Sequence, residues 1–359
     1  MKPTHLQHEL YSLLQEGTVI PAHPLALHQD LGIDEERQKQ LTRYYIASGA
    51  GGVAVGVHTT QFEIRQPEFN LLEQTLKLAS EQILKADLHR PFLKVAGICG
   101  PTAQAIGEAE LAIKHGYHFG LVSIGGLSGY SEIELLKRAI AIAEIIPVFG
   151  FYLQPAVGGR FLSYDFWRAF AEIPNVHAIK VAAFNRYQTL DVVRAVCNSS
   201  RRNEIALYTG NDDNIVADLL TPYRFLVNEE KIEKKFVGGL LGHWAVWTEK
   251  AVELFTEIKK CIANDYDGME DLLSKGVEVT DMNAALFDIQ HSFKGSIAGI
   301  HEVLRRQQLL EGRWCLNPRE VLSDGQMEEI DRIYKNYPHL TDDEFVKGFL
   351  EAEKVRTSV

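Results

Sequence analysis

The chain has 359 residues, of which 46% are hydrophobic and 24% are charged, and its formal net charge is −11. This length allows one large domain or two ordinary ones, and the composition is that of a globular protein with a sizeable core. The acidic balance excludes a general nucleic-acid binder, which carries a basic stripe, and it disfavours binding to an anionic membrane surface.

The cysteines are isolated from one another, at Cys99, Cys197, Cys261 and Cys315. Without a CxxC pair, they fit neither a zinc knuckle nor a disulfide framework. The first eight residues, MKPTHLQH, lack the apolar core of a signal peptide, and no apolar run is long enough to span a bilayer. We therefore expect a cytoplasmic protein that neither enters nor binds a membrane.

Short apolar runs alternate with longer helical patterns from residue 17 to about residue 262. The runs predicted as strands are 18–21, 52–57, 92–98, 120–124, 148–152, 175–180, 205–208 and 235–240. The segments predicted as helices are 34–48, 68–88, 101–115, 131–145, 163–173, 187–197, 211–220 and 244–262. Ser131 and Glu134 have the spacing of a capping box at the start of one such helix.

Eight strand–helix units in about 245 residues match the number and length of a (β/α)8 barrel. The strands are apolar at both parities, as expected for parallel strands that are buried on both faces. A doubly wound sheet is the alternative, but no GxGxxG motif follows the first strand.

The pattern beyond residue 262 is wholly helical. Residues 281–302 carry apolar side chains at helical spacing, and further helices are predicted at 323–334 and 342–354. We therefore divide the chain into a catalytic barrel, residues 1–262, and a C-terminal helical extension, residues 263–359. The extension is expected to cover the barrel wall or to make oligomer contacts.

Lys180 and Tyr152 end the sixth and fifth predicted strands. Active sites of such barrels lie at the carboxyl ends of the strands, so the two side chains are predicted to lie side by side. If both point into the barrel, alternation along the fifth strand puts Gly150 on the inward face and turns Phe149 and Phe151 outward.

A buried lysine beside a tyrosine suits imine chemistry. Burial lowers the pKa of a lysine from its ordinary value near ~10.4 and frees the amine as a nucleophile. The amine can condense with a ketone to an imine, which serves as the electron sink, so no cofactor is expected, and the tyrosine can move protons. The alternative is that Lys180 simply extends from a strand end into solvent.

The residues around this pair resemble the dihydrodipicolinate synthase / N-acetylneuraminate lyase family of class I, pyruvate-type aldolases, which are (β/α)8 barrels. The family has a Tyr-Asn-x-Pro-like turn after strand five, similar to Tyr152–Pro155, and a Pro-Asn-(apolar)-x-(apolar)-Lys pattern, which Pro174–Lys180 matches. Its Ser-Gly-x-Asp after strand seven is similar to Thr209–Asp212, and its Gly-Thr-Thr-Gly-Glu after strand two is similar to Gly56–Glu63. The resemblance covers residues 17 to about 262.

The resemblance implies roles for individual residues. Lys180 would form the imine, and Tyr152 would relay protons and contact the substrate carboxylate. Thr59 and Thr60, or alternatively His58 and Thr59, would bind the carboxylate of a 2-oxo acid, and the backbone of Gly210 would line the pocket. The family commonly forms tetramers, so a homo-oligomer, dimer or tetramer, is expected.

Two departures from the family pattern bear on the substrate. Gly125 and Gly126 stand where the synthase has a tyrosine pair, and Val157 stands near the place of the synthase arginine, with Arg160 three residues later. We therefore expect a different lyase, aldolase or dehydratase that acts on a 2-oxo acid, with or without an aldehyde partner. Arg160 and His243 are further candidates for substrate binding.

Two other functions stay open. The histidines show no HxH or HxxxH pair with a carboxylate partner, so we expect no metal, although a metal-dependent lyase is an alternative. A barrel that has lost its chemistry and binds a metabolite without turnover is the other. The mixed-charge run Lys231–Lys235 is interpreted as solvated surface.

Overall fold

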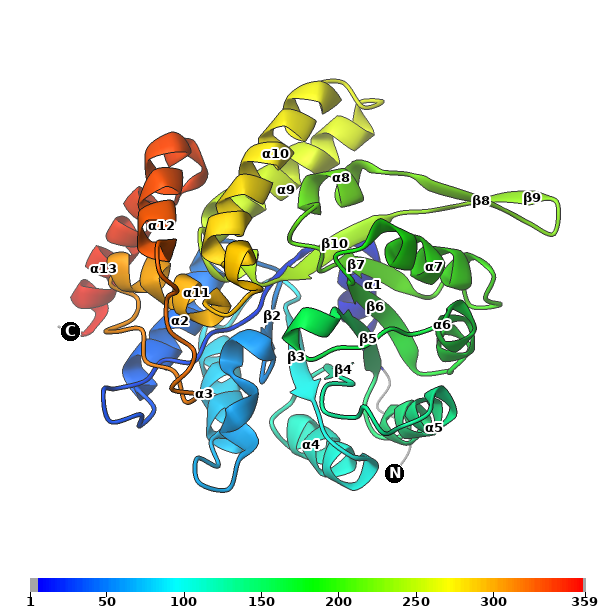
Figure 1. Ribbon diagram of the computed structural model, residues 1–359, viewed down its shortest axis with the longest axis horizontal. Coiled ribbons are helices and arrows are strands. Elements are labelled where there is room, and N and C mark those ends of the chain that lie inside the picture. The colour runs from blue at the N-terminus through cyan, green and yellow to red at the C-terminus, as the bar shows by residue number, and fades with distance from the viewer. Residues whose placement is uncertain (1–5, 358–359) are drawn as a thin grey trace. The chain divides into compact units, whose positions relative to one another are not determined.

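The computed structural model describes residues 6–357, so part of the segment inspected for a signal peptide, residues 1–5, lies outside the described residues. Eight parallel strands belong to one sheet, and helices follow them along the chain (Figure 1). The predicted (β/α)8 barrel with C-terminal helices is confirmed. The described residues fall into two compact parts, one of residues 6–18 with Arg90–Leu241 and one of Val19–His89 with residues 242–357.

The first part contains six barrel strands in the order β10-β7-β6-β5-β4-β3, each parallel to its neighbour. The strands are β3 (Leu93–Ile98), β4 (Phe119–Val122), β5 (Val148–Leu153), β6 (Val176–Ala182), β7 (Ala206–Thr209) and β10 (Phe236–Leu241). Its helices are α1 (His8–Glu16), α4 (Thr102–Lys114), α5 (Glu132–Ala143), η3 (Pro155–Val157), α6 (Tyr164–Ala171), α7 (Arg186–Cys197) and α8 (Ile215–Leu220). The strands are almost entirely buried, which explains their apolar character at both parities.

Local hydrogen bonds start the helices of this part. The Ser131 side chain accepts from the amide of Glu134, and the Glu134 carboxylate accepts from the amide of Ser131 at 2.7 Å, so the predicted capping box is confirmed. The side chain of Asn185 caps α7 by accepting from the amides of Tyr187 and Gln188.

Two elements of the first part were not predicted. One is α1, whose Leu14 carbonyl accepts a 2.9 Å hydrogen bond from the Tyr208 hydroxyl of β7. The other is an antiparallel hairpin of β8 (Tyr223–Val227) and β9 (Glu230–Lys234), which projects beyond α7 (Figure 1). The run interpreted as solvated surface, 231–235, is therefore mostly a β-strand.

The second part contains the first two strands and the C-terminal helices. Its strands are β1 (Val19–Pro21) and β2 (Gly52–Val55). Its helices within residues 19–89 are α2 (Glu35–Ala47), η1 (His58–Thr60), η2 (Phe62–Arg65) and α3 (Leu72–Lys85). The later ones are η4 (His243–Ala245), α9 (Thr248–Ala263), α10 (Met269–Leu286), η5 (Ile289–His291), α11 (Ser296–Arg306), α12 (Gln326–Asn336), η6 (Pro338–Leu340) and α13 (Asp343–Thr357).

The predicted helix over residues 281–302 is wrong, because the chain breaks between α10 and α11. The backbone is left-handed at Asp288, Ser292 and Phe293, which a continuous helix does not allow. The carboxylate of Asp288 holds the break by accepting from the amide of Gly295 at 3.0 Å and from the hydroxyl of Ser323. The apolar spacing continued through this break, so periodicity alone did not reveal it.

A buried polar network ties the C-terminal helices to the rest of the second part. The carboxylate of Asp342 accepts from the Tyr44 hydroxyl at 2.6 Å, from the Gln307 amide at 2.7 Å and from the backbone of Glu249. The predicted boundary at residues 262 and 263 falls at the end of α9, and a separate extension domain stays a prediction.

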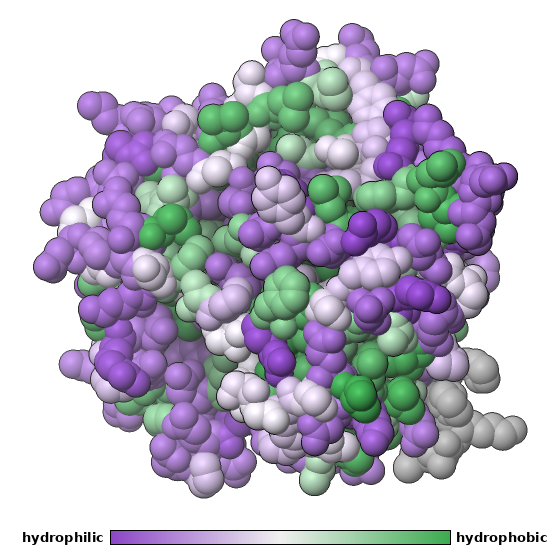
Figure 2. Space-filling model, turned by 45° about the vertical axis from the view of Figure 1, so that its right-hand side comes forward, coloured by the Kyte–Doolittle hydropathy of each residue, from purple (hydrophilic) through white to green (hydrophobic). Residues whose placement is uncertain are grey.

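Polar and charged side chains cover much of the face in Figure 2, with apolar side chains in scattered patches. Within residues 6–357, no helix combines the length and the apolar character that crossing a bilayer requires.

Candidate active site

Lys180 lies in the middle of the carboxyl half of β6, two residues before the strand ends at Ala182. Only 8% of it is exposed, so the alternative of a lysine that extends freely into solvent is wrong. Its Nζ lies 4.4 Å from the centroid of the Phe151 ring on β5. An aromatic face at this distance favours a cation at Nζ, whether ammonium or iminium.

The register of β5 and β6 puts Phe151, and not Tyr152, beside Lys180. Phe151 is the direct partner of Lys180, whereas Tyr152 is the partner of Val181. Because paired residues of adjacent strands point to the same face, Lys180 and Phe151 share one face and Tyr152 lies on the other. The prediction that Tyr152 points inward beside Lys180, with Phe151 outward, is therefore wrong.

The environment of Tyr152 agrees with this register. Its ring centroid lies 5.3 Å from that of Trp167 on α6, and its hydroxyl accepts a 3.4 Å hydrogen bond from the amide of Leu162. Burial raises the pKa of this phenol. Gly150, on the same face, lies so close to α6 that a Cβ would stand 2.6 Å from the Phe170 ring.

Gly210 directly follows β7 and contacts the side chain of Lys180. Its amide donates to the carbonyl of Val181 at 2.7 Å, which continues the β-ladder past the end of β7. A Cβ at this position would stand 2.5 Å from Cε of Lys180 and 2.9 Å from Cβ of Ala182. The lysine side chain therefore runs across the bare backbone of this glycine. That the backbone of Gly210 lines a substrate pocket stays a prediction.

The electrostatics of Lys180 favour a free amine. Burial lowers the pKa of Lys180 to about 8, and the nearby carboxylate of Asp212 opposes part of this decrease. Asp212 is itself buried. The lysine therefore titrates near the neutral range while a negative charge stays close enough to stabilise its cationic form.

Asp218 of α8 holds the segment that carries Gly210 and Asp212. It is fully buried and accepts from Thr209 at 2.7 Å, from Asn211 at 2.9 Å and from the Tyr223 hydroxyl at 2.9 Å. It also forms an ion pair with Arg186 at the start of α7. Sequence reasoning missed this residue, because no local pattern marks an aspartate whose partners come from three separate segments of the chain.

Arg160 joins two loops of the first part. Its guanidinium donates to the carbonyl of Tyr130 at 2.6 Å and to that of Leu127 at 3.5 Å. These bonds hold the loop after β4, which contains Gly125 and Gly126, to the loop after β5. A substrate-binding role for Arg160 stays a prediction.

Thr59 and Thr60 belong to the second part, in the turn η1 after β2. The Thr59 hydroxyl donates to the carbonyl of Ala22 at 2.8 Å, and the Thr60 hydroxyl donates to that of His23 at 2.6 Å. The Thr60 oxygen also accepts from the amides of Gly56 and Val57. Both hydroxyls therefore fix the turn to the end of β1, and their binding of a carboxylate stays a prediction.

His58 and His243 also belong to the second part. The ring of His58 lies 5.9 Å from that of Phe62. His243 follows β10 in η4, where its ring lies 5.8 Å from Trp247. Burial lowers the pKa of His243 to about 4, with a hydrogen bond to Asn283 opposing the shift, so this imidazole is neutral at physiological pH.

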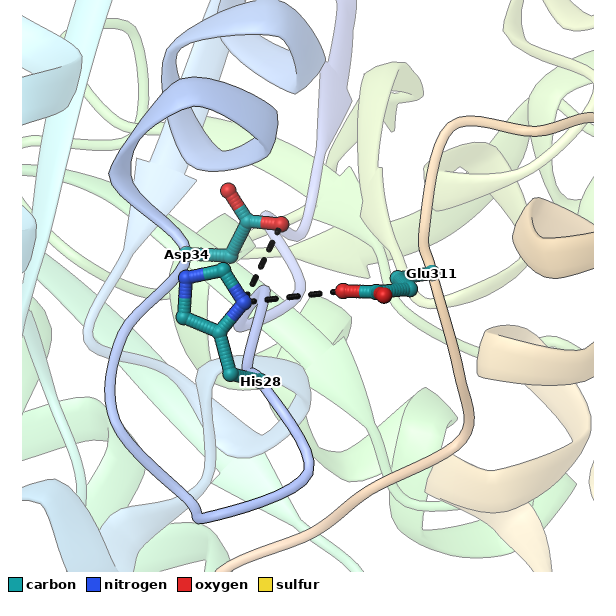
Figure 3. A group of neighbouring side chains, drawn as sticks. All are labelled: His28, Asp34 and Glu311. Atoms are coloured by element: carbon teal, nitrogen blue, oxygen red, sulfur yellow. Dashed lines mark ion pairs between the residues drawn. The ribbon is translucent and has the colours of Figure 1, made fainter.

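One group of possible metal ligands occurs among the described residues: His28, Asp34 and Glu311, whose ligand atoms lie within 4.8 Å of one another (Figure 3). His28 Nδ1 lies 3.8 Å from the Asp34 carboxylate and 3.5 Å from that of Glu311. Asp34 also caps α2 and pairs with Arg37 at 3.2 Å, and the other two side chains are about half exposed. Surface ion pairing accounts for this geometry.

Comparison with known proteins supports the family resemblance that the sequence indicated. No protein-family model matches the chain. A 4-hydroxy-tetrahydrodipicolinate synthase from Aromatoleum aromaticum is 29% identical over 196 residues, which cover 54% of this chain and 63% of that protein. The resemblance to the dihydrodipicolinate synthase / N-acetylneuraminate lyase family is confirmed.

Solved structures of this family share the fold. N-acetylneuraminate lyase from Fusobacterium nucleatum has a TM-score of 0.69 at 15% identity, covering 90% of this chain and 99% of that one. Dihydrodipicolinate synthase from Oceanobacillus iheyensis has a TM-score of 0.71 at 16% identity, covering 92% and 99%. The synthase from Acinetobacter baumannii, solved with pyruvate, has a TM-score of 0.70 at 18% identity, covering 89% and 98%.

Proposed function

We propose that this protein is a Schiff-base-forming lyase, aldolase or dehydratase that acts on a 2-oxo acid of the pyruvate type through Lys180. The observation that supports this most is the state of the lysine: it is buried, its pKa is lowered to about 8, and its Nζ lies on the Phe151 ring. The match to a 4-hydroxy-tetrahydrodipicolinate synthase supports the same chemistry. We further propose a cytoplasmic homo-oligomer.

The chemistry begins with the neutral amine of Lys180. It attacks the C2 carbonyl carbon of the 2-oxo acid, and the resulting carbinolamine loses water to give a protonated imine. The positive nitrogen draws electrons from C3, so C3 can lose a proton, or the bond from C3 to a leaving aldehyde can break. The Phe151 ring and the Asp212 charge both favour the cationic imine over the neutral amine.

We propose that the proton transfers use a group other than Tyr152, the residue that the family resemblance implied. Tyr152 lies on the helix-facing side of β5, with its ring on Trp167. A phenol on this face points away from the side of the strand that carries Lys180, which argues against proton exchange between the two groups. We therefore propose that imine formation at Lys180 is independent of the Tyr152 hydroxyl.

The substrate carboxylate is assigned to the turn with Thr59 and Thr60 on the family resemblance alone. In the structure each hydroxyl already donates to a backbone carbonyl. Binding of a carboxylate by these hydroxyls would therefore require each to exchange its acceptor. His58, Arg160 and His243 complete the set of proposed substrate contacts.

The test is reductive trapping. The protein is treated with borohydride in the presence of pyruvate, and the adduct is located by intact and peptide mass spectrometry. We expect an adduct on the peptide that contains Lys180, and none in Lys180→Ala. Failure of pyruvate and other 2-oxo acids to form this adduct would overturn the proposal.

Lys234 provides a matched control for burial. Burial also lowers the pKa of Lys234 to about 8, but its Nζ donates to the carbonyl of Arg202 at 2.6 Å. Lys234→Ala should therefore keep the adduct on Lys180. An adduct on Lys234 would show that a lowered pKa alone, rather than the site around Lys180, selects the reacting amine.

A barrel that captures a metabolite without turnover is the second candidate, because Phe151 supplies no hydroxyl at the position beside Lys180. The two functions differ in proton exchange at C3. If the imine proceeds to an enamine, the methyl protons of pyruvate exchange with deuterium in D2O, which NMR follows directly. An adduct without exchange would support the binding function and contradict turnover through C3.

A further inference from the structure

The β8–β9 hairpin has an open edge along β9. Asn228 and Glu229 form its two-residue turn, and both have positive φ, as hairpin turns of this length require. Among the described residues, the backbone of Glu230–Lys234 bonds to β8 and to no other segment. Unpaired backbone groups along a strand are a template for another strand.

The sequence of this edge is complementary to itself. Glu230-Lys231-Ile232-Glu233-Lys234 placed antiparallel to a second copy, with Ile232 at the centre, sets Glu230 opposite Lys234 and Lys231 opposite Glu233. Each charged residue is then opposite a residue of the other charge, and the central isoleucine faces itself. Within one copy Glu230 already pairs with Arg202 at 3.6 Å and Lys234 donates to the Arg202 carbonyl at 2.6 Å, so the proposal rests on the pair of Lys231 with Glu233. Directly opposed side chains on adjacent antiparallel strands interact, so this register is favoured over its neighbours.

We propose that β9 pairs antiparallel with β9 of a second copy of this chain, which joins two hairpins into one four-stranded sheet about a two-fold axis. The contact is isologous, because the same strand serves on both sides. This inference names an interface for the proposed homo-oligomer and does not depend on the proposed chemistry of Lys180.

The outward face of the hairpin supports this register. Within one copy, Glu233 pairs with Arg224 at 2.9 Å and with Lys235 at 3.5 Å, and Lys231 is exposed with no partner among residues 6–357. In the four-stranded sheet, Lys231 of one copy would lie beside Glu233 of the other copy, on the side away from Arg224 of that copy. Each glutamate would then lie between an arginine of its own chain and a lysine of the other, and the unpartnered lysine would gain a partner.

The opposite face supports it as well. Phe225 is the direct partner of Ile232 within the hairpin, and both are partly exposed. Pairing of two copies would give an unbroken row of Phe225, Ile232, Ile232 and Phe225 across four strands. Burial of apolar surface along this row would add to the main-chain hydrogen bonds. The edge of β8 offers no such symmetry, since Arg224 would face Leu226.

The test uses charge reversal in the full chain. Lys231→Glu places like charges opposite each other twice in the dimer, whereas the double variant Lys231→Glu with Glu233→Lys restores opposite charges. By sedimentation velocity, the single variant should raise the dissociation constant about tenfold or more, and the double variant should recover most of that loss. Lys347→Glu, an exposed lysine on α13, is the control for net charge and should leave association unchanged.

Hydrogen exchange gives a second measurement that does not depend on a substitution. Amides of β9 should be protected at high protein concentration and lose protection on dilution. A wild-type protein that stays monomeric at every concentration would overturn the proposal, and the charges would then serve to prevent strand pairing. An oligomer that is indifferent to Lys231→Glu, or a double variant as weak as the single one, would overturn it too.

Discussion

The titration of Lys180 can be tested through the pH dependence of imine formation. Only the neutral amine attacks the carbonyl, so the trapping rate should follow the fraction of Lys180 that is deprotonated. With a pKa of about 8, roughly 10% of Lys180 is neutral at pH 7, against about 0.04% for an ordinary lysine with a pKa near 10.4. Burial therefore supplies a gain of about 200-fold in reactive amine at this pH.

The perturbation is Asp212→Asn. Because the charge of Asp212 raises the pKa of Lys180 against the effect of burial, its removal should move the half-maximal pH of trapping below 8. The variant should therefore react faster than the wild type below pH 7, and the two rates should converge above pH 9. The assay is the initial rate of pyruvate adduct formation with cyanoborohydride, followed by intact mass spectrometry.

Asp213→Asn is the matched control. It removes the neighbouring carboxylate, which does not act on Lys180. A wild-type midpoint near pH 10, or an Asp212→Asn variant whose midpoint stays in place or rises, would refute the electrostatic account of this lysine. Equal shifts in both variants would show that the effect is one of general charge rather than of contact.

Three further outcomes follow from the contacts. Gly210→Ala should slow adduct formation at least about tenfold and lower the unfolding free energy by about 1–3 kcal/mol, because the new methyl overlaps the Lys180 side chain; unchanged trapping would contradict the close approach. Tyr152→Phe should keep the trapping rate within about twofold and lose about 1 kcal/mol of stability with its hydrogen bond to Leu162; abolished trapping would restore the phenol to the reaction. Glu302 is buried among three arginines, which lower its pKa to about 2. Its ion pairs therefore add to the free energy of unfolding above the pKa of the unfolded state, and this contribution is lost as the pH falls towards 2. In urea titrations, Glu302→Gln should cost about 1–3 kcal/mol at pH 7 and much less near pH 2; a cost that does not depend on pH would contradict this.

Interactions within a few residues of each other could be predicted from the sequence. The eight strand–helix units and the capping box of Ser131 and Glu134 rest on apolar runs and short-range hydrogen bonds. The motif that ends at Lys180 likewise indicated the family. The break at Asp288 was missed, because the bonds that stabilise it come from Gly295 and from Ser323, 35 residues away.

The orientation of side chains at the candidate site depended on tertiary structure. Alternation along a strand gives two possible faces, and a shift of one residue exchanges them. The pairing of β5 with β6 has an irregularity between Val148 and Phe149, and this irregularity sets Phe151 opposite Lys180. The sequence alone held no signal for that shift, so Tyr152 was assigned to the wrong face.

The sequence by itself therefore determined the barrel, the family that the chain resembles and the lysine that we propose as the nucleophile. Those features depend on local periodicity and on motifs that are contiguous in the chain. Only the tertiary structure decided which aromatic residue contacts Lys180 and that the charge of Asp212 acts on it. It also decided that Asp218 holds the segment that carries Asp212, through a hydrogen bond from Thr209. These depend on strand register and on contacts between distant segments, which are fixed only when the whole barrel packs.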